Sequence, residues 1–333
     1  MIADIVVDLQ YGDCGKGKVT HHLLKNNNYT HCIRYNGGCN AGHTIFHEGK
    51  RYITHHIPAG VFFGVKSIIG SGCVLNPEQF FDEIKELQKS GIDCEQLIKV
   101  ANNAHIITDA HLTEDGKDDW LGTTRRGNGP AYRDKYSRTG YRAESTRILD
   151  SYLVDLYEEL YGNDKEEPVV LLEGAQGFGL DIDWGDFPYV TSSHCTTAGA
   201  LLNAISHRAI RRVWGVAKCY ETYVGSKRFQ PKDQDIFNMI REVGKEFGAT
   251  TGRPRQCNWM NINLLKKAIT INDVTDLVIN KMDVLRQVGV WKIRHDDDNS
   301  IVTKLQNETE MKKYLTKVFP DIRIHFSDNP ERI

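Results

Sequence analysis

The sequence predicts an α/β protein with a mostly parallel central sheet flanked by helices, and three observations support this prediction. Short apolar runs of strand length recur along the chain, helical patterns lie between them, and a glycine-rich turn follows the first run. Alternating strands and helices are typical of parallel sheets covered on both faces. Because no Pro/Gly/Ser-rich linker divides the chain, we expect a single domain over residues 1–333.

The predicted elements begin with a short buried strand over residues 4–9, followed by a glycine-rich turn at 12–18 and a helix over 19–25. Further strands are expected at residues 67–70, 169–172, 212–216 and 277–280, and helices at 78–90 and 236–247. The polar, basic segments 109–138 and 223–233 are expected to be long loops, which are often functional in compact domains. Residues 296–310 are expected to form a solvated excursion.

Composition narrows the classes of function. Apolar residues make up 40% of the chain, charged residues 26%, and the formal net charge is −2, so no global field favours nucleic acid or an anionic membrane. The eight cysteines show no CxxC spacing, which favours reduced, buried thiols. The first residues lack a signal-peptide pattern, and no apolar run is long enough to span a bilayer. We expect a cytoplasmic protein (in the host cytoplasm if a phage encodes it).

Residues 12–18, with the sequence GDCGKGK, nearly match the phosphate-loop pattern GxxxxGK[ST]. The match fails at Val19, where the hydroxyl that would hold magnesium is missing. A nucleotide site here needs its metal ligand elsewhere, and Asp13 is the candidate because carboxylate oxygen suits Mg²⁺. An ordinary glycine-rich turn is the alternative for this segment taken alone.

Two further segments carry candidate ligand-binding chemistry. In residues 36–44 the glycines allow the backbone to approach a ligand and offer a carbonyl to a metal, and His43 could donate to a phosphoryl group. After a predicted strand, Asn280-Lys281-Met282-Asp283 suits guanine, since Asp283 can accept from N1–H and the 2-amino group while the stem of Lys281 covers the ring. Together with the glycine-rich turn, this pattern favours GTP over ATP.

Six ordered motifs make the chain similar to the adenylosuccinate synthetase family, from residue 6 to about residue 330. The motifs lie at residues 12–18, 40–44, 122–124 with 129–132, 173–177, 188–192 and 248–253. The resemblance implies a fold related to P-loop GTPases. It also implies a GTP-dependent ligase that joins L-aspartate to C6 of a 6-oxopurine nucleoside 5′-monophosphate through a 6-phosphoryl intermediate, releasing GDP and phosphate. In length the chain is closer to the archaeal and phage branch, which includes phage 2-aminoadenylosuccinate synthase.

The resemblance also implies roles for individual residues. Asp13 would take the N1 proton of the purine, His43 and Lys16 would stabilise the transferring phosphoryl group, and Mg²⁺ would sit on Asp13 and the Gly42 carbonyl. GTP would be bound by Gly12, Gly15, Lys16, Gly17, Lys18, Gly42, Thr44, Lys281, Asp283 and Ser327. The purine monophosphate would be bound by Asp13, Asn40, Thr124, Arg138, Gln176, Thr191 and Arg253, with Arg138 reaching across a homodimer into the neighbouring site. L-Aspartate would be bound by Thr251, Arg253 and Arg255.

Several positions depart from the family pattern and bear on the purine substrate. The first strand ends in Val7-Asp8-Leu9-Gln10 where most members carry small residues before the glutamine, Cys14 replaces an acidic residue, and residues 223–230 lose the Gly-Pro-Phe-Pro run that shapes the ribose side. A phage relative that makes 2-aminoadenylosuccinate from dGMP has a similar first strand, but a small residue matches Asp13 and the donor is ATP. Asp13 therefore favours IMP, whereas the strand and the rebuilt loop favour dGMP, which we prefer.

A regulatory GTPase is the rival from another class of function. The near-Walker loop and the Asn-Lys-x-Asp pattern would serve such a switch equally well. A switch needs the loop hydroxyl for magnesium, which Val19 cannot supply, and it has no use for the arginines at 253 and 255.

Overall fold

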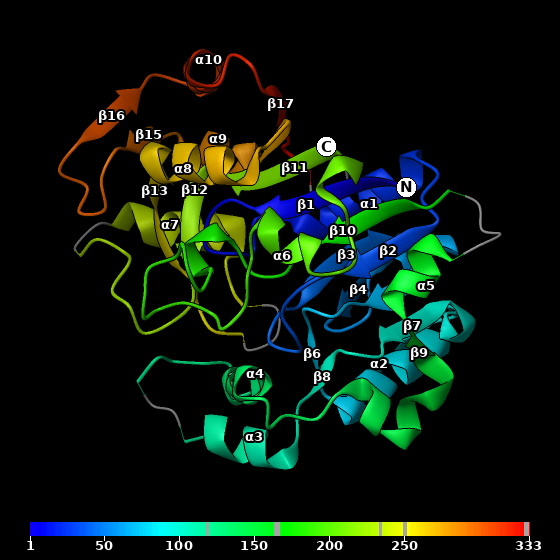
Figure 1. The fold of residues 1–333 in the computed structure, drawn as a ribbon. Coiled ribbons are helices and arrows are strands. Elements are labelled where there is room, and N and C mark those ends of the chain that lie inside the picture. Colours follow the sequence, from blue (N-terminus) through cyan, green and yellow to red (C-terminus); the bar gives the residue numbers. More distant parts are fainter. Residues whose placement is uncertain (118–119, 163–166, 233–234, 249–251, 330–332) are drawn as a thin grey trace.

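The computed structural model describes residues 1–117, 120–162, 167–232, 235–248, 252–329 and 333 (Figure 1). Within these residues the main sheet has nine strands, and every neighbouring pair runs parallel. Across the sheet the order is β17 (Arg323–Phe326), β14 (Asp276–Asn280), β11 (Ile210–Lys218), β1 (Ile2–Asp8), β10 (Val169–Glu173), β2 (His31–Arg34), β5 (Lys66–Ile69), β7 (Ile98–Ala101) and β9 (Leu153–Val154). The four strands predicted after the first are among them.

Smaller sheets and the helices complete the described part of the chain. A second sheet contains β12 (Tyr220–Tyr223), β13 (Gln256–Asn261), β15 (Trp291–Arg294) and β16 (Val302–Leu305), and two-stranded sheets pair β3 (His43–His47) with β4 (Lys50–Thr54) and β6 (Val74–Leu75) with β8 (His105–Ile106). The α-helices are α1 (Lys16–Asn26), α2 (Pro77–Lys89), α3 (Asp109–Asp115), α4 (Asn128–Ser137), α5 (Leu156–Tyr161), α6 (Thr197–Leu201), α7 (Asp235–Gly244), α8 (Ile262–Asn272), α9 (Met282–Val288) and α10 (Glu308–Val318).

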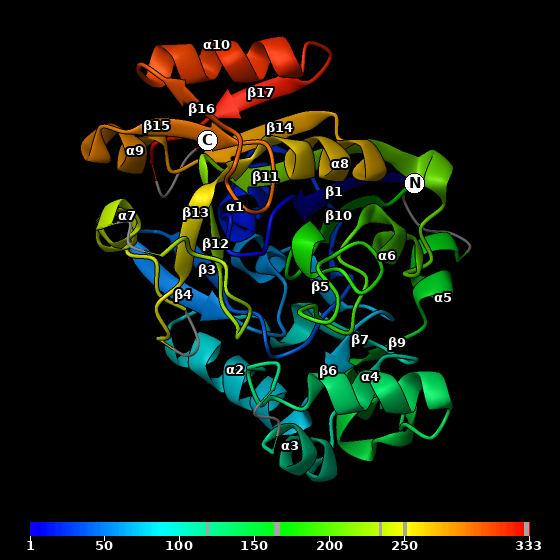
Figure 2. The ribbon, with the colours of Figure 1, turned by 90° about the vertical axis from the view of Figure 1, so that its left-hand side faces the viewer.

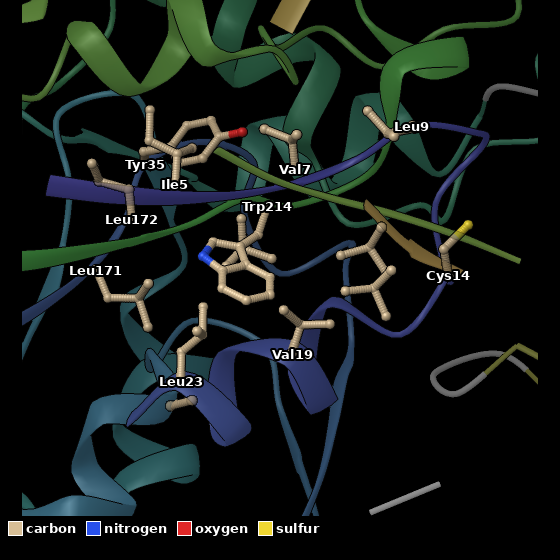
Figure 3. Close-up of a cluster of buried hydrophobic side chains, with 14 of the residues drawn as sticks. Ile5, Val7, Leu9, Cys14, Val19, Leu23, Tyr35, Leu171, Leu172 and Trp214 are labelled. Carbon is tan, nitrogen blue, oxygen red and sulfur yellow. The ribbon is translucent and has the colours of Figure 1, made fainter. Parts of the chain in front are cut away.

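The core forms where β1 meets its neighbours. Ile5 and Val7 have no exposed surface, which explains why this strand is an almost unbroken apolar run. Figure 3 shows Val19 and Leu23 of α1 on one side of β1 together with Trp214, while Val7 points to the other side. Helices α1, α6 and α8 all contact the central strands, so the predicted sheet flanked by helices is confirmed.

Local signals place the helices. The side chain of Asn76 accepts a hydrogen bond from the Gln79 amide at 3.0 Å, and Pro77 occupies the first turn of α2, where a missing N–H costs nothing. Helix α1 begins at Lys16 rather than at residue 19, because Gly15 adopts φ 100° and turns the chain directly into the helix.

The prediction that residues 109–138 form a loop is wrong, since this segment contains α3 and α4. Both helices lie at the lower end of the molecule in Figures 1 and 2, far from α10 at the upper end. Helix α4 buries little more than Ala131 and Tyr132, so its sequence lacks apolar periodicity, and the Tyr132 hydroxyl ties it to the Gly72 carbonyl at 2.8 Å. Residues 296–310 contain β16 and the start of α10, and none of them is buried, in agreement with the predicted solvated excursion.

Segments with predicted ligand-binding residues follow the carboxyl ends of parallel strands. The glycine-rich turn follows β1, residues 36–44 follow β2, residues 174–177 follow β10, and the Asn-Lys-x-Asp turn closes β14. Ligands of open parallel sheets bind along this edge. That residues 1–333 form one domain stays a prediction.

Candidate active site

A cavity of about 660 Å³ lies at this edge of the sheet. Fourteen predicted site residues line it: Gly12, Asp13, Gly15, Lys16, Gly17, Asn40, Gly42, His43, Thr44, Thr124, Gln176, Thr191, Arg253 and Arg255. Lys18, Arg138, Lys281, Asp283 and Ser327 are not among the residues that line it. Thr251 lies outside the described residues.

The glycine-rich turn is held from inside by Asp8, the last residue of β1. One carboxylate oxygen accepts from the amides of Gln10 and Gly12 at 3.0 and 3.2 Å. The other oxygen accepts from the Cys14 amide at 3.0 Å and from the Lys16 ammonium at 3.1 Å. The side chain of Asp8 is fully buried, so this carboxylate fixes both the loop and the lysine that faces the cavity.

The two lysines of the turn point in different directions. Residues two apart on a helix lie on nearly opposite sides, and the ammonium of Lys16 lies at the cavity whereas that of Lys18 donates to Ser327 Oγ at 2.7 Å and to the Asn329 carbonyl at 2.9 Å. Burial lowers the pKa of Lys18 to about 8. The lysine of this loop that serves the cavity is therefore Lys16.

His43 lies against a buried ion pair. Its Nδ1 is 2.5 Å from a carboxylate oxygen of Glu173, which also accepts from Arg34 at 2.6 Å. Burial and the Arg34 guanidinium lower the pKa of His43 to about 4. Burial raises the pKa of Glu173, but Arg34 and His43 outweigh it and bring the value to about 2. The Nε2 atom of His43 is buried and has no hydrogen-bond partner among the described residues.

Asn40 is the centre of a hydrogen-bonded group on another wall. Its Oδ1 accepts from Asn128 at 2.8 Å and from Gln176 at 2.9 Å. The backbone of Gly37 lies so near that a Cβ there would come within 2.8 Å of the Gln176 side chain. These hydrogen bonds connect three segments around the cavity: the loop after β2, the loop after β10 and the start of α4.

Asp13 meets one of the predicted aspartate-binding arginines. It adopts φ 58° at the tip of the glycine-rich turn, and its Oδ2 is 2.9 Å from the Arg255 guanidinium. A second branch of Arg255 donates to Glu246 at 2.5 Å. Arg253 donates to the carbonyls of Gly122 and Thr123 at 3.1 and 3.3 Å, which connects its segment to the 122–124 loop.

The Asn-Lys-x-Asp turn joins the glycine-rich turn through its first residue. The Asn280 amide donates to the Cys14 carbonyl at 2.6 Å, and a Cβ on Gly15 would lie 2.8 Å from it, so only glycine fits at position 15. Lys281 has φ 68° and donates to the Gly244 carbonyl at 2.8 Å, and Asp283 lies in the first turn of α9. Ser327 reaches the same region through the Met282 amide, which donates to its carbonyl.

One group among the described residues has metal-ligand spacing, but it serves the fold. Both oxygens of Asp181 accept backbone amides, from Asp183 at 3.0 Å and from Cys195 at 2.6 Å, and His194 completes the group. The cavity instead offers the carboxylate of Asp13 and the backbone of Gly42. Oxygen donors of this kind suit Mg²⁺.

Sequence reasoning missed the buried charges that hold the site together. Four charged residues are almost fully buried: Asp8, Arg34, Lys218 and Glu246. Each forms an ion pair either with a residue that lines the cavity or with a residue that contacts the cavity lining. Asp8, Arg34 and Lys218 are each the last residue of a strand, and a charge at the end of a buried strand is the available signal because it requires a partner. Glu246 lies outside the strands and gives no such signal. The partners lie far away in sequence, so the pairing itself could not be predicted.

These features define a class of protein: an α/β fold with a glycine-rich turn after its first strand and a cavity at the carboxyl edge of a parallel sheet, where such folds usually bind phosphate-bearing ligands. The adenylosuccinate synthetase family model matches residues 5–149 and 143–318. An adenylosuccinate synthetase of Caldanaerobacter subterraneus is 36% identical over 88% of this chain and 80% of that protein, and one of Deinococcus radiodurans is 36% identical over 84% and 80%. The chain belongs to the adenylosuccinate synthetase family. It is therefore a ligase, and the family uses GTP.

Two solved structures have the same fold. The fully ligated adenylosuccinate synthetase of Plasmodium falciparum has a TM-score of 0.87 at 27% identity, with 99% of this chain and 98% of that chain covered. A succinoaminodeoxyadenylate synthetase of cyanophage S-2L, bound to dGMP and dATP, has a TM-score of 0.72 at 21% identity, with 95% and 99% covered. The family prediction is confirmed. The phage branch stays a prediction, since the sequence relatives named above are bacterial.

None of the described helices combines the length and apolar character that crossing a membrane requires. A cytoplasmic location stays a prediction.

The role of Asp8 can be tested by Asp8→Asn. An amide in place of one carboxylate oxygen would set a donor against Lys16 or a loop amide, at a cost of about 1–3 kcal/mol. We expect weaker GTP binding by calorimetry and a lower melting temperature. Asp4→Asn is the matched control, because Asp4 is a buried aspartate near the start of β1 that pairs with Arg211 at 2.5 Å. It should lower the melting temperature alone, and unchanged GTP affinity in Asp8→Asn would contradict the assignment.

Proposed function

We propose that the chain joins L-aspartate to C6 of a 6-oxopurine nucleoside 5′-monophosphate, with GTP converted to GDP and phosphate. One observation carries the proposal: Asp13, at the tip of the glycine-rich turn, pairs with Arg255 in the wall of a single cavity. A base for the purine, a phosphate-binding loop and an arginine for a carboxylate are thereby brought together.

In the first step Asp13 takes the N1 proton and the purine O6 attacks the γ-phosphorus of GTP. The O6–P bond forms, the bond from the γ-phosphorus to the β–γ bridging oxygen breaks, and GDP leaves. Lys16, fixed by Asp8, contacts the transferring phosphoryl group. Nδ1 of His43 faces Glu173, so Nε2 donates to this group when the phosphoryl charge raises the pKa of His43 and the ring takes a second proton. Such preorganised contacts stabilise charge that develops in the transition state.

In the second step the amine of L-aspartate attacks C6 and the C6–O6 bond breaks. Phosphate leaves with O6 and takes the proton that the amine gives up. Arg253 and Arg255 bind the carboxylates of the amino acid, since a guanidinium can pair with a carboxylate through two hydrogen bonds. Asn40, Thr124, Gln176 and Thr191, all in the cavity wall, bind the nucleoside monophosphate. Thr251 belongs to the same proposal but lies outside the described residues.

Mg²⁺ would be held by Asp13 and the Gly42 carbonyl, both at the cavity. When bound, it neutralises charge on the phosphate oxygens.

GTP is the proposed donor because the side chains of Lys281 and Asp283, in the Asn-Lys-x-Asp turn, suit guanine. Asn280 joins this turn to the glycine-rich turn by a hydrogen bond. One nucleotide could therefore place its base at the Asn-Lys-x-Asp turn and its phosphates at the glycine-rich turn. Lys18 and Ser327 are hydrogen-bonded to each other beside this turn. The C-terminal turn is therefore part of the proposed base pocket.

For the purine acceptor we propose dGMP, with IMP as the alternative. The rebuilt segment places Tyr223 and Phe229 against Tyr11, with ring centroids 5.8 and 5.0 Å apart, and Tyr11 and Tyr223 line the cavity. The Tyr11 hydroxyl donates to Asp186 at 2.8 Å, and the ring faces of this wall offer a 2′-hydroxyl no hydrogen bond, which favours a deoxynucleotide. The retained Asp13 and the bacterial relatives support IMP instead.

Arg138 is proposed to serve a neighbouring site. It lies at the end of α4 with φ 66°, is exposed, and is not part of its own chain's cavity. A homodimer in which Arg138 contacts the partner's nucleotide phosphate would account for this position.

Purified protein incubated with GTP, L-aspartate and either dGMP or IMP tests the proposal. We expect aspartate-dependent release of phosphate, with kcat/KM for dGMP about 10-fold or more above that for IMP. Replacing GTP by ATP should lower the rate. Turnover of IMP alone would contradict dGMP as the acceptor, and phosphate release that does not depend on aspartate would contradict ligase activity.

A further inference from the structure

Glu246 is a buried carboxylate that the proposed chemistry does not use. Its side chain has no exposed surface, and four polar groups approach it. Oε1 accepts from the Tyr220 hydroxyl at 2.6 Å, and Oε2 accepts from Lys218 at 3.0 Å and from Arg255 at 2.5 Å. The ammonium of Lys281 lies 4.0 Å away, the weakest of these contacts.

The backbone adds a second connection to the same arginine. The Arg255 amide donates to the Glu246 carbonyl at 2.9 Å, Phe247 pairs with Pro254, and the Gly248 amide donates to the Arg253 carbonyl at 2.8 Å. Residues 246–248 therefore run alongside 253–255. Arg255 is fixed to Glu246 by main chain and side chain together.

Arg255 is in turn the partner of Asp13. One branch of its guanidinium faces Glu246 and another faces Asp13 at 2.9 Å. A planar guanidinium that is hydrogen-bonded through one of its nitrogens can direct its remaining N–H donors in few directions. The orientation of Arg255 toward the cavity is thus set by Glu246, which is itself held by Lys218 and Tyr220.

We propose that Glu246 is a positioning residue for the ligase reaction, which fixes Arg255 for the carboxylate of L-aspartate and, through Arg255, the orientation of Asp13. The inference rests on the proposed function. Lys218, which donates to Glu246, is the last residue of β11 and is paired in register with Asn280 of β14.

Steady-state kinetics of Glu246→Gln tests this proposal. The glutamine keeps the volume and can still accept from Tyr220, but its neutral side chain no longer holds Arg255 by charge. We expect KM for L-aspartate to rise about 10-fold and kcat to fall, while KM for GTP and for the monophosphate changes less than about two-fold.

A double-mutant cycle separates positioning from general destabilisation. In an Arg255→Met background, Glu246→Gln should leave KM for L-aspartate unchanged, because the residue through which it acts is gone. A merely structural role predicts equal effects in both backgrounds. Glu221→Gln is the matched control: Glu221 is also fully buried and accepts from an arginine, Arg294, at 2.5 Å, and neither residue lines the cavity. It should lower the melting temperature without changing KM for L-aspartate.

Tyr220→Phe keeps the proposal testable if Glu246→Gln does not fold. It removes only the hydroxyl that Oε1 accepts from, and KM for L-aspartate should rise about two- to three-fold, again only when Arg255 is present. Unchanged KM for L-aspartate in the folded variants of an active protein would overturn the positioning role alone. A wild-type protein that does not consume L-aspartate would overturn the proposed function instead.

Discussion

Asp13→Asn is expected to lower kcat by about 1,000-fold, because asparagine keeps the shape of the side chain but cannot accept the N1 proton. Loss of a positioned general base typically costs between about 100- and 10,000-fold in rate. Asp13 lies at the cavity with φ 58°, a backbone conformation that asparagine tolerates well, so the loop should survive the change. The measurement is GDP and phosphate release in the presence of GTP, L-aspartate and nucleoside monophosphate.

Two further readouts make this test specific. Asparagine can still accept from Arg255, so a folded variant should keep KM for L-aspartate within a few-fold of the wild type. GTP affinity, measured by calorimetry without magnesium, should also persist, because the glycine-rich turn is held by Asp8 rather than by Asp13. Coupling that continues undiminished would show that another group takes the proton.

The sequence was informative where chemistry is local in the chain. The glycine-rich turn, residues 36–44 and the Asn-Lys-x-Asp turn each occupy one short segment, and parallel topology brings their strand ends to one edge. Fourteen predicted site residues consequently share one cavity. The apolar strands were equally clear, since strands buried on both faces have little polar alternation.

Pairings between distant residues could not be read in the same way. Glu246 contacts Lys218 across 28 positions and Arg34 contacts Glu173 across 139, and no periodic pattern encodes either pair. Helix α4 was missed because it is held by Tyr132 and by the turn at Gly127 rather than by an apolar face. That Lys18 points away from the cavity could not be predicted either. It follows from the start of α1 at Lys16, which depends on the conformation of Gly15.

His43→Asn is expected to lower kcat by about 100- to 1,000-fold, the usual cost of removing one preorganised group that stabilises a transition state. The shorter side chain can still approach Glu173 but brings no nitrogen to the position of Nε2, the buried ring atom without a described partner, and it cannot take a second proton there. Glu173 keeps its contacts with Arg34 at 2.6 Å and with the Ala59 amide at 3.0 Å, so the local fold should persist. The effect should appear in kcat measured at saturating GTP and L-aspartate.

The chain contains a matched control for this second variant. His31, at the start of β2, is also buried and lies 3.0 Å from a glutamate, Glu159, but it is not among the residues that line the cavity. His31→Asn therefore removes a comparable buried pair and should lower the melting temperature while leaving kcat within about two-fold of the wild type. Equal losses of kcat in the two variants would mean that His43 contributes to folding rather than to phosphoryl transfer. A loss confined to His43→Asn would assign the effect to His43, whose Nε2 has no hydrogen-bond partner among the described residues.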